Sequence, residues 1–176
     1  MKVLSLTHKD YRNLLPDTFV PDEGVNVICG ENAQGKTNLL EALWLFTGGR
    51  SFRGVRDKEL VCRGKEQAKL TLSFFRDDRP QNAEIVLSGG RRTASYNGIA
   101  LKSPGQLVGR VCGVIFSPEH IALVREGPAG RRAFLDSALC QLRPGYAKLL
   151  NRYQHTLSQR NALLKDIPRH VELVDT

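Results

Sequence analysis

The sequence predicts an α/β fold in which a strand, a glycine-rich loop and a helix lie beside an antiparallel β-meander, followed by the start of a helical lobe. A β-branched run, a glycine-rich stretch and an apolar segment with helical spacing succeed one another over residues 25–46. Strand-like runs separated by turn residues fill 69–101, and helical character dominates from Arg131 onward. We therefore expect a first domain over 1–124 and a second over 125–176.

The N-terminal elements follow from local patterns. Alternating apolar and polar residues predict a strand over 2–7, and a short second strand follows at 17–20. Residues 25–29 read Val-Asn-Val-Ile-Cys and are typical of a buried strand. Apolar residues at helical spacing then predict a helix over 38–46, which the glycine pair after it ends.

The middle of the chain predicts a meander. Polar residues 50–65 favour loops with one short helical turn near 57–61. Strands are expected in the runs 69–75, 83–87, 93–96 and 99–101. Asn97-Gly98 separates the last two runs and is a strong signal for a two-residue hairpin turn. A further buried strand is expected at 111–116, and Ser117-Pro118 after it favours a helix start.

The C-terminal part predicts helices with an apolar stripe. Its residues recur at spacings of three, four and seven: Tyr146, Leu150, Tyr153, Leu157 and Leu164. The simplest interpretation is a helix packed on a neighbour. A coiled coil is the alternative, although fewer than three heptads are visible.

Composition limits the classes of function. The net charge of +8 and the pI of about 9.6 favour a polyanionic partner, although a solvated basic face would give the same values. Without an apolar signal core or a run of the ~20 apolar residues that a membrane span needs, we expect a cytoplasmic protein without a membrane partner. The cysteines are far apart and form no Cys-x-x-Cys pair, so we expect neither metal binding nor disulfides: Cys29, Cys62, Cys112 and Cys140.

The chemistry is concentrated in one glycine-rich motif. Gly, four residues and Gly-Lys-Thr is the pattern of a phosphate loop, and it is formed by Gly30, Glu31, Asn32, Ala33, Gln34, Gly35, Lys36 and Thr37. Successive backbone N–H groups of such a loop bind phosphate, and its glycines allow dihedral angles and close approaches that a Cβ would forbid. Lys36 is placed to bridge the β- and γ-phosphates, and the Thr37 hydroxyl to ligate Mg²⁺. The chain is therefore expected to bind a nucleoside triphosphate, with ATP and Mg²⁺ as cofactors.

Five blocks in order along the chain resemble the RecF family of bacterial DNA repair and replication ATPases. They are Tyr11-Arg12-Asn13-Leu14, the phosphate loop 30–37, Gly49-Arg50-Ser51-Phe52-Arg53, Val114-Ile115-Phe116-Ser117-Pro118-Glu119, and Glu126-Gly127-Pro128 leading to Arg131-Arg132-Ala133-Phe134-Leu135-Asp136. The resemblance implies an ABC-type ATPase head with a helical second lobe. It also implies DNA junctions or gaps as the substrate, an ATP-dependent homodimer, and cooperation with RecO and RecR to load RecA in replication and gap repair.

The resemblance also implies further site residues. Arg12 and Asn13 are expected beside the nucleotide, although a surface arginine on a strand-end turn would fit the same residues. Arg50 and Arg53 either approach nucleotide or DNA or are solvated loop charges. Related heads carry a glutamine near Glu119; here a helix-capping role for Ser117 and Glu119 is favoured instead.

No catalytic residue is identified in the sequence. Leu87-Ser88-Gly89-Gly90 looks like the ABC signature, but hairpin residues follow it, so we interpret it as a turn between two strands. By the resemblance, the catalytic carboxylates lie in a C-terminal half that this chain stops before. We therefore expect weak nucleotide binding and negligible hydrolysis by these 176 residues.

Two other classes of function fit less well. A phosphate-loop kinase or GTPase needs alternating strands and helices, whereas the meander interrupts that alternation, and the Asn-Lys-x-Asp guanine reader is absent from the sequence. A nucleotide-sensing protein scaffold without DNA contact remains the alternative to a DNA-binding protein.

Overall fold

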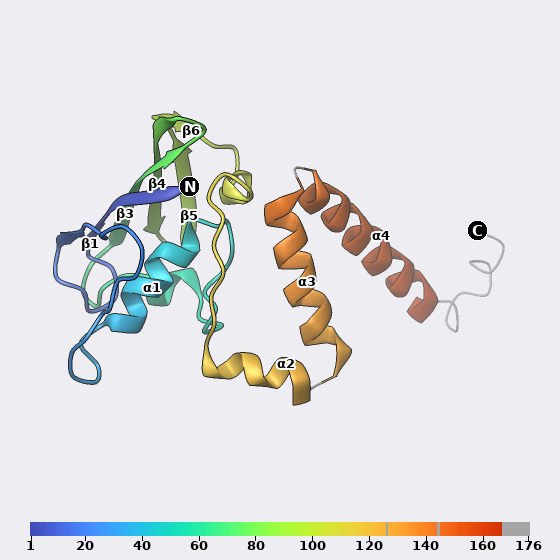
Figure 1. Ribbon diagram of the computed structural model, residues 1–176. Coiled ribbons are helices and arrows are strands. Elements are labelled where there is room, and N and C mark those ends of the chain that lie inside the picture. The colour runs from blue at the N-terminus through green and yellow to red at the C-terminus, as the bar shows by residue number, and fades with distance from the viewer. Residues whose placement is uncertain (126, 144, 167–176) are drawn as a thin grey trace. The chain divides into compact units, whose positions relative to one another are not determined.

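The computed structural model describes residues 1–125, 127–143 and 145–166, and it divides into two compact units. Unit 1 runs from Met1 to His120 and unit 2 from Ile121 to Thr176. Figure 1 shows the strands and helix α1 of unit 1 and the helices of unit 2.

Unit 1 is built on a six-stranded sheet with the order β2-β1-β3-β4-β5-β6, and all neighbours are antiparallel. The strands are β1 (Lys2–Lys9), β2 (Asp17–Phe19), β3 (Gln67–Arg76), β4 (Arg79–Ser88), β5 (Arg91–Tyr96) and β6 (Ile99–Ala100). The expected meander is therefore confirmed as β3 to β6. It pairs with β1 through the register Leu6 to Leu72.

Local turn chemistry sets the hairpins of this sheet. Asn97 and Gly98 have φ angles of 49° and 78°, as a two-residue turn with two left-handed positions requires. Gly89 and Gly90 take φ angles of 56° and 73° between β4 and β5. The Ser-Gly-Gly segment is thus a strand-to-strand turn, as predicted, and it does not begin a helix.

One face of the sheet carries the core of unit 1. Alternate residues of β3 and β4 are buried, for example Leu70 opposite Ile85 and Leu72 opposite Ala83. Helix α1 (Lys36–Leu45) contributes Ala42 and Leu45 to the same cluster. Because this helix begins within the glycine-rich motif, the core holds the motif in place. The helix starts two residues earlier than expected.

Two expected buried strands are absent from the described chain. Residues 25–29 form no strand, and Val25 and Val27 are 89% and 79% exposed. The strand expected at 111–116 is reduced to an isolated bridge between Val111 and Val108, and Val114 is 93% exposed. These predictions were wrong because β-branched composition favours extended backbone, whereas a strand also needs a neighbouring strand to accept and donate its hydrogen bonds.

Short helical turns join the larger elements. The short helical turn expected near 57–61 is present as the 3-10 helix η1 (Asp57–Leu60), and η2 (Pro104–Leu107) follows the meander. The helix start predicted at Ser117-Pro118 is confirmed by η3 (Pro118–Ile121) and α2 (Ala122–Arg125).

Unit 2 contains α3 (Pro128–Leu142) and α4 (Tyr146–Asp166). The expected helices are present, and the Tyr146 hydroxyl donates a 2.7 Å hydrogen bond to Asp136. The packing predicted for the stripe is only partial: Tyr146 and Leu150 are half-buried, whereas Tyr153 and Leu164 are 63% and 46% exposed, and no described residue of α3 or α4 is buried. No helix in the described ranges is long and apolar enough to cross a membrane.

A pair of glycines tests how tightly α1 is joined to the rest of unit 1. Gly48 has a φ angle of 81°, and a Cβ there would overlap Cγ2 of Val108 and lie 2.9 Å from its backbone nitrogen. We expect Gly48→Ala to lower the free energy of unfolding by about 3 kcal/mol, since backbone strain and a backbone clash add.

Gly24 is the matched control because its φ angle is 82° and a Cβ would meet nothing within 4 Å. Gly24→Ala should cost only about 1 kcal/mol, the left-handed penalty alone. Denaturant unfolding of both variants measures the difference, and equal losses would contradict the predicted clash.

Candidate nucleotide-binding site

The glycine-rich motif folds into a loop that leads directly into α1. Gly30 and Gly35 have φ angles of 149° and 98°, and Ala33 between them is also left-handed at 66°. Gly35 is the N-cap of the helix. The first N–H groups of a helix have no partners within it, so this end is suited to bind an anion.

Lys36 and Thr37 lie at that helix end. The Lys36 ammonium donates to the carbonyl oxygens of Gly30 at 2.6 Å and Glu31 at 2.7 Å, so the side chain bends back across the loop. The Thr37 side chain belongs to an exposed residue in the first turn of α1. The arrangement provides a cation, a hydroxyl and backbone N–H groups within one turn of chain.

The segment after β1 packs directly on this loop. A Cβ at Gly35 would come within 2.5 Å of Leu14 Cδ2 and 3.1 Å of Asn13 Oδ1. Glycine is needed at 35 because both its dihedral angle and this close approach exclude a side chain.

Asn13 connects the two segments by hydrogen bonds. Its Nδ2 donates to the Ala33 carbonyl at 2.7 Å, and its Oδ1 accepts from Asn38 Nδ2 at 2.6 Å. Asn38 in turn accepts a hydrogen bond from Arg53, with 2.9 Å between Arg53 Nη1 and Asn38 Oδ1. The structure thus brings Asn13 and Arg53 to the phosphate loop and the first turn of α1.

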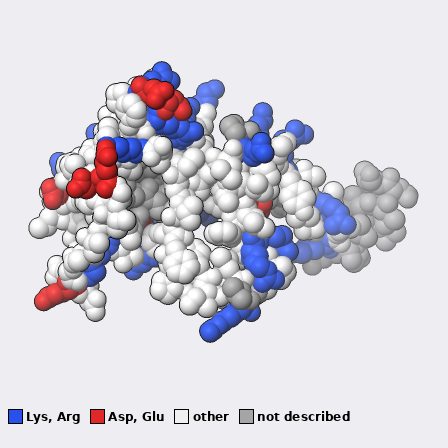
Figure 2. Space-filling model, in the orientation of Figure 1, with Lys and Arg blue, Asp and Glu red and all other residues white. Residues whose placement is uncertain are grey.

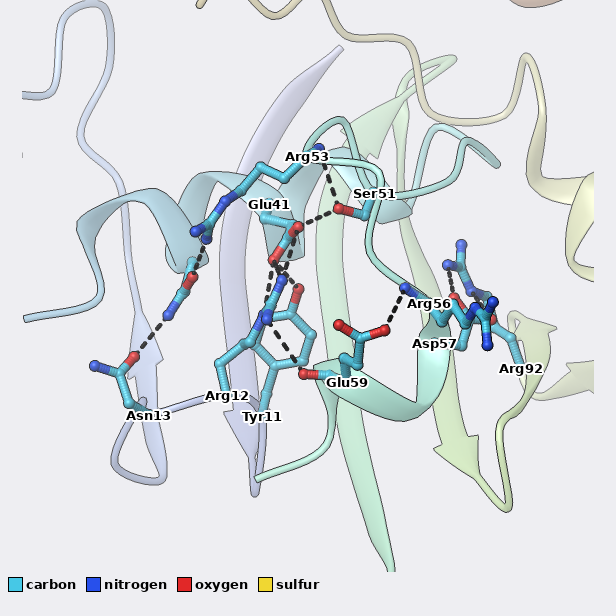
Figure 3. Close-up of polar contacts among 11 residues, drawn as sticks. Tyr11, Arg12, Asn13, Glu41, Ser51, Arg53, Arg56, Asp57, Glu59 and Arg92 are labelled. Carbon is cyan, nitrogen blue, oxygen red and sulfur yellow. Dashed lines mark hydrogen bonds and ion pairs between the residues drawn. The ribbon is translucent and has the colours of Figure 1, made fainter. Parts of the chain in front are cut away.

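Arg12 lies next to Asn13 but points elsewhere. Its Nε and Nη2 donate to Glu41 at 3.1 and 3.0 Å, and its Nη1 donates to the Glu59 carbonyl at 3.2 Å. Figure 3 shows Arg12 and Tyr11 directed together toward Glu41. The Arg12 side chain is 16% exposed and that of Glu41 is fully buried.

Glu41 has two further donors. Tyr11 donates at 3.2 Å, and Ser51 makes a short hydrogen bond to the same carboxylate. Burial, together with the negative charge of Glu41, raises the pKa of Tyr11 well above its ordinary value, so the phenol remains a donor. The sequence reasoning missed Glu41; the available signal was a charged residue between Leu40 and Ala42 on the buried side of α1.

Arg92 forms a second ion pair nearby. It contacts Asp57 and donates to the Gly49 carbonyl at 2.7 Å, which fixes the loop after α1. Arg50 is exposed, and its carbonyl accepts from Trp44 at 2.9 Å. Sequence reasoning had not singled out Arg92.

Ser117 and Glu119 were expected to cap the start of a helix. The Ser117 N–H donates to His120 Nδ1 at 2.9 Å, so a histidine interacts with the start of η3. The Glu119 side chain lies outside the described part of the structure.

Comparison with known proteins decides the family. The AAA domain family matches residues 5–119. The chain belongs to the AAA domain family. It is also 38% identical to the DNA replication and repair protein RecF of Syntrophotalea carbinolica, with 95% of the chain aligned, and 41% identical to that of Acetivibrio thermocellus, with 96% aligned.

These matches confirm the resemblance to RecF proteins. They include 48% and 46% of the two relatives, so the chain spans about half the length of the curated relatives it matches. A solved structure named "recombination mediator protein RecF-ATP in RecFOR pathway" is 38% identical, with a TM-score of 0.88 over 96% of this chain and 46% of that one.

A more distant structure supports the fold alone. The SMC head domain from Thermotoga maritima is 20% identical, with a TM-score of 0.54 over 76% of this chain and 54% of that one. The expected α/β fold is thereby confirmed.

A cleft of about 470 Å³ adjoins the phosphate loop of this AAA-domain chain. Its lining includes His8 and Asp17 from the paired strands β1 and β2, together with Leu14, Ile28 and Lys36. His8 is buried, and within the described residues its Nδ1 has no hydrogen-bond partner. Burial lowers the pKa of His8 below 6.5, and the Asp17 carboxylate opposes part of that shift.

The lowered pKa of His8 predicts a pH dependence of stability. Below about pH 6.5 the unfolded chain binds a proton at this histidine more readily than the folded chain does. The stability of the wild type should therefore fall, relative to His8→Leu, as the pH decreases from 6.5, and the difference should level off below the folded pKa. Urea unfolding between pH 5 and pH 8 measures this, and parallel pH profiles would show that His8 is not responsible.

Proposed function

We propose that this chain binds ATP with Mg²⁺ in the loop 30–37, and that it does so as part of an ATP-dependent recombination mediator acting on DNA. The observation that supports ATP binding most directly is the loop itself, with its left-handed glycines, Lys36 across its mouth and α1 beginning within it. The relatives named RecF, and the RecF-ATP structure, support the wider assignment.

Each group of the loop would bind a different part of the Mg-ATP complex. Backbone N–H groups of Gly30, Glu31, Asn32, Ala33, Gln34 and Gly35 would bind phosphate oxygens. Lys36 would neutralise the triphosphate, and the Thr37 hydroxyl would ligate Mg²⁺, which prefers oxygen ligands. Asn13 completes the site from the segment after β1, where its neighbour Arg12 is bound to Glu41 rather than turned toward the loop. The adjoining cleft has room for the nucleoside.

The charge of the chain supports a nucleic-acid substrate. Lys and Arg outnumber Asp and Glu by 26 to 18, and Figure 2 shows their side chains over the visible face of both units. We propose DNA junctions or gaps as that substrate, with RecO and RecR as partners in loading RecA. An ATP-dependent homodimer and a cytoplasmic location belong to the same proposal, as does ATPase activity of the full-length protein. Negligible hydrolysis is proposed for the 176 residues alone.

Replacement of Lys36 tests the nucleotide site. We expect Lys36→Ala to weaken Mg-ATP binding by roughly 10- to 150-fold, since hydrogen bonds to charged groups contribute about 1.5–3 kcal/mol. Titration with a fluorescent ATP analogue measures the affinity. Lys102→Ala is the matched control because Lys102 is exposed and lies outside the motif. Unchanged affinity in Lys36→Ala would refute the proposed site.

Salt dependence separates a DNA-binding protein from a protein scaffold. If the basic residues contact DNA, log affinity for a gapped duplex should fall linearly with log salt, with a slope of about −0.9 for each phosphate neutralised. Binding isotherms at several salt concentrations give that slope. Absence of binding at low salt would favour the nucleotide-sensing scaffold.

A further inference from the structure

Helix α1 carries a buried carboxylate that joins three separate segments of unit 1. Glu41 lies one helical turn after Thr37 and accepts hydrogen bonds from Tyr11, Arg12 and Ser51. Its side chain is fully buried, so these donors and the Arg12 guanidinium replace the water that the carboxylate has lost. Figure 3 shows the donors converging on it from the segment after β1 and from the loop after α1.

Two connections lead from this carboxylate back to the start of α1. The first passes through Arg12 to its neighbour Asn13, which donates to the Ala33 carbonyl of the phosphate loop. The second passes through Ser51, whose hydroxyl accepts from the Arg53 N–H at 3.1 Å. Asn13 and Arg53 each share a hydrogen bond with Asn38, so the two connections meet.

The donors of Arg12 are largely committed to this arrangement. Nε and Nη2 contact Glu41, and Nη1 contacts the Glu59 carbonyl. Arg12 also has a left-handed φ angle of 52°, which aims the next residue across the turn. Its contribution to the site is therefore made through Asn13.

We infer that Glu41 is a positioning residue for nucleotide binding, which acts through Arg12 to hold Asn13 against the phosphate loop at Ala33. The inference rests on the proposed ATP site and identifies residues that tune it without contacting nucleotide. Arg12 then supports the nucleotide site indirectly, by holding Asn13. The negative charge of Glu41 matters as well as its shape, because Gln could accept a hydrogen bond but would leave the Arg12 charge part-buried without a counterion.

A double-mutant cycle in the 176-residue chain tests this. We expect Glu41→Gln and Asn13→Ala each to weaken Mg-ATP binding by about tenfold, and the double variant to be weakened by about the same tenfold, because both changes act through one contact. Additive effects, about 100-fold in the double variant, would show that Glu41 acts elsewhere and would overturn the inference. A general loss of stability would produce that additive result.

Controls separate the inference from the proposed function. If the wild type binds Mg-ATP and Lys36→Ala does not, while Glu41→Gln binds normally, only the inference fails. If the wild type itself does not bind Mg-ATP, the proposed function fails and the inference with it. Should Glu41→Gln not fold, Arg12→Lys takes its place in the cycle, since lysine keeps the charge but loses the two-point grip on the carboxylate.

Discussion

The ion pair between Arg12 and Glu41 is the interaction on which the arrangement of the site depends. A carboxylate without solvent contact is costly, and five hydrogen bonds from three side chains compensate for the lost water. Removing one partner of such a pair typically costs about 3–5 kcal/mol, because the other charge is left uncompensated. The pair joins the segment after β1 to the helix that begins in the phosphate loop, so the loop cannot shift independently of that segment.

The sequence predicted those parts of the fold that are determined by residues close together in the chain. Asn97-Gly98 favours the left-handed angles of the turn that it forms, and the phosphate loop is recognisable from the spacing of Gly30, Gly35 and Lys36. The hairpin between β3 and β4 was longer than expected because Asp77 and Asp78 both take left-handed φ angles, of 53° and 59°. Aspartate tolerates that conformation but signals it less clearly than glycine does.

The parts that sequence did not predict depend on partners distant in the chain. Glu41 is 29 residues from Arg12, and its neighbours in sequence give no sign of which donors will reach it. The strands expected at 25–29 and 111–116 are absent for the same reason: apolar residues indicate that a segment can be buried, but a strand also needs a neighbouring strand with which to pair. Within the described residues no strand pairs with either segment. The later part of the stripe on α4, at Tyr153 and Leu164, is exposed for the same reason.

The turn after β1 shows why a network of this extent is needed. Asp10 and Arg12 both have left-handed φ angles, of 53° and 52°, and each such residue outside glycine stores of order 1 kcal/mol of strain. Strain of this kind persists only where surrounding contacts determine the backbone. Here Arg12 N–H donates to the Leu60 carbonyl at 2.9 Å, and Cys62 N–H donates to the Asp10 carbonyl at 2.8 Å.

Those backbone bonds hold the turn on one side only, toward the end of η1 and the residues that follow it. The Arg12 side chain holds it on the other side, toward α1. Next to the turn, the Asn13 amide donates to the carbonyl of Ala33, which is itself left-handed at 66°. Asn13 follows the strained turn directly and donates to the left-handed Ala33 of the phosphate loop, so the inferred role of the buried carboxylate is to hold the turn from which that hydrogen bond is made.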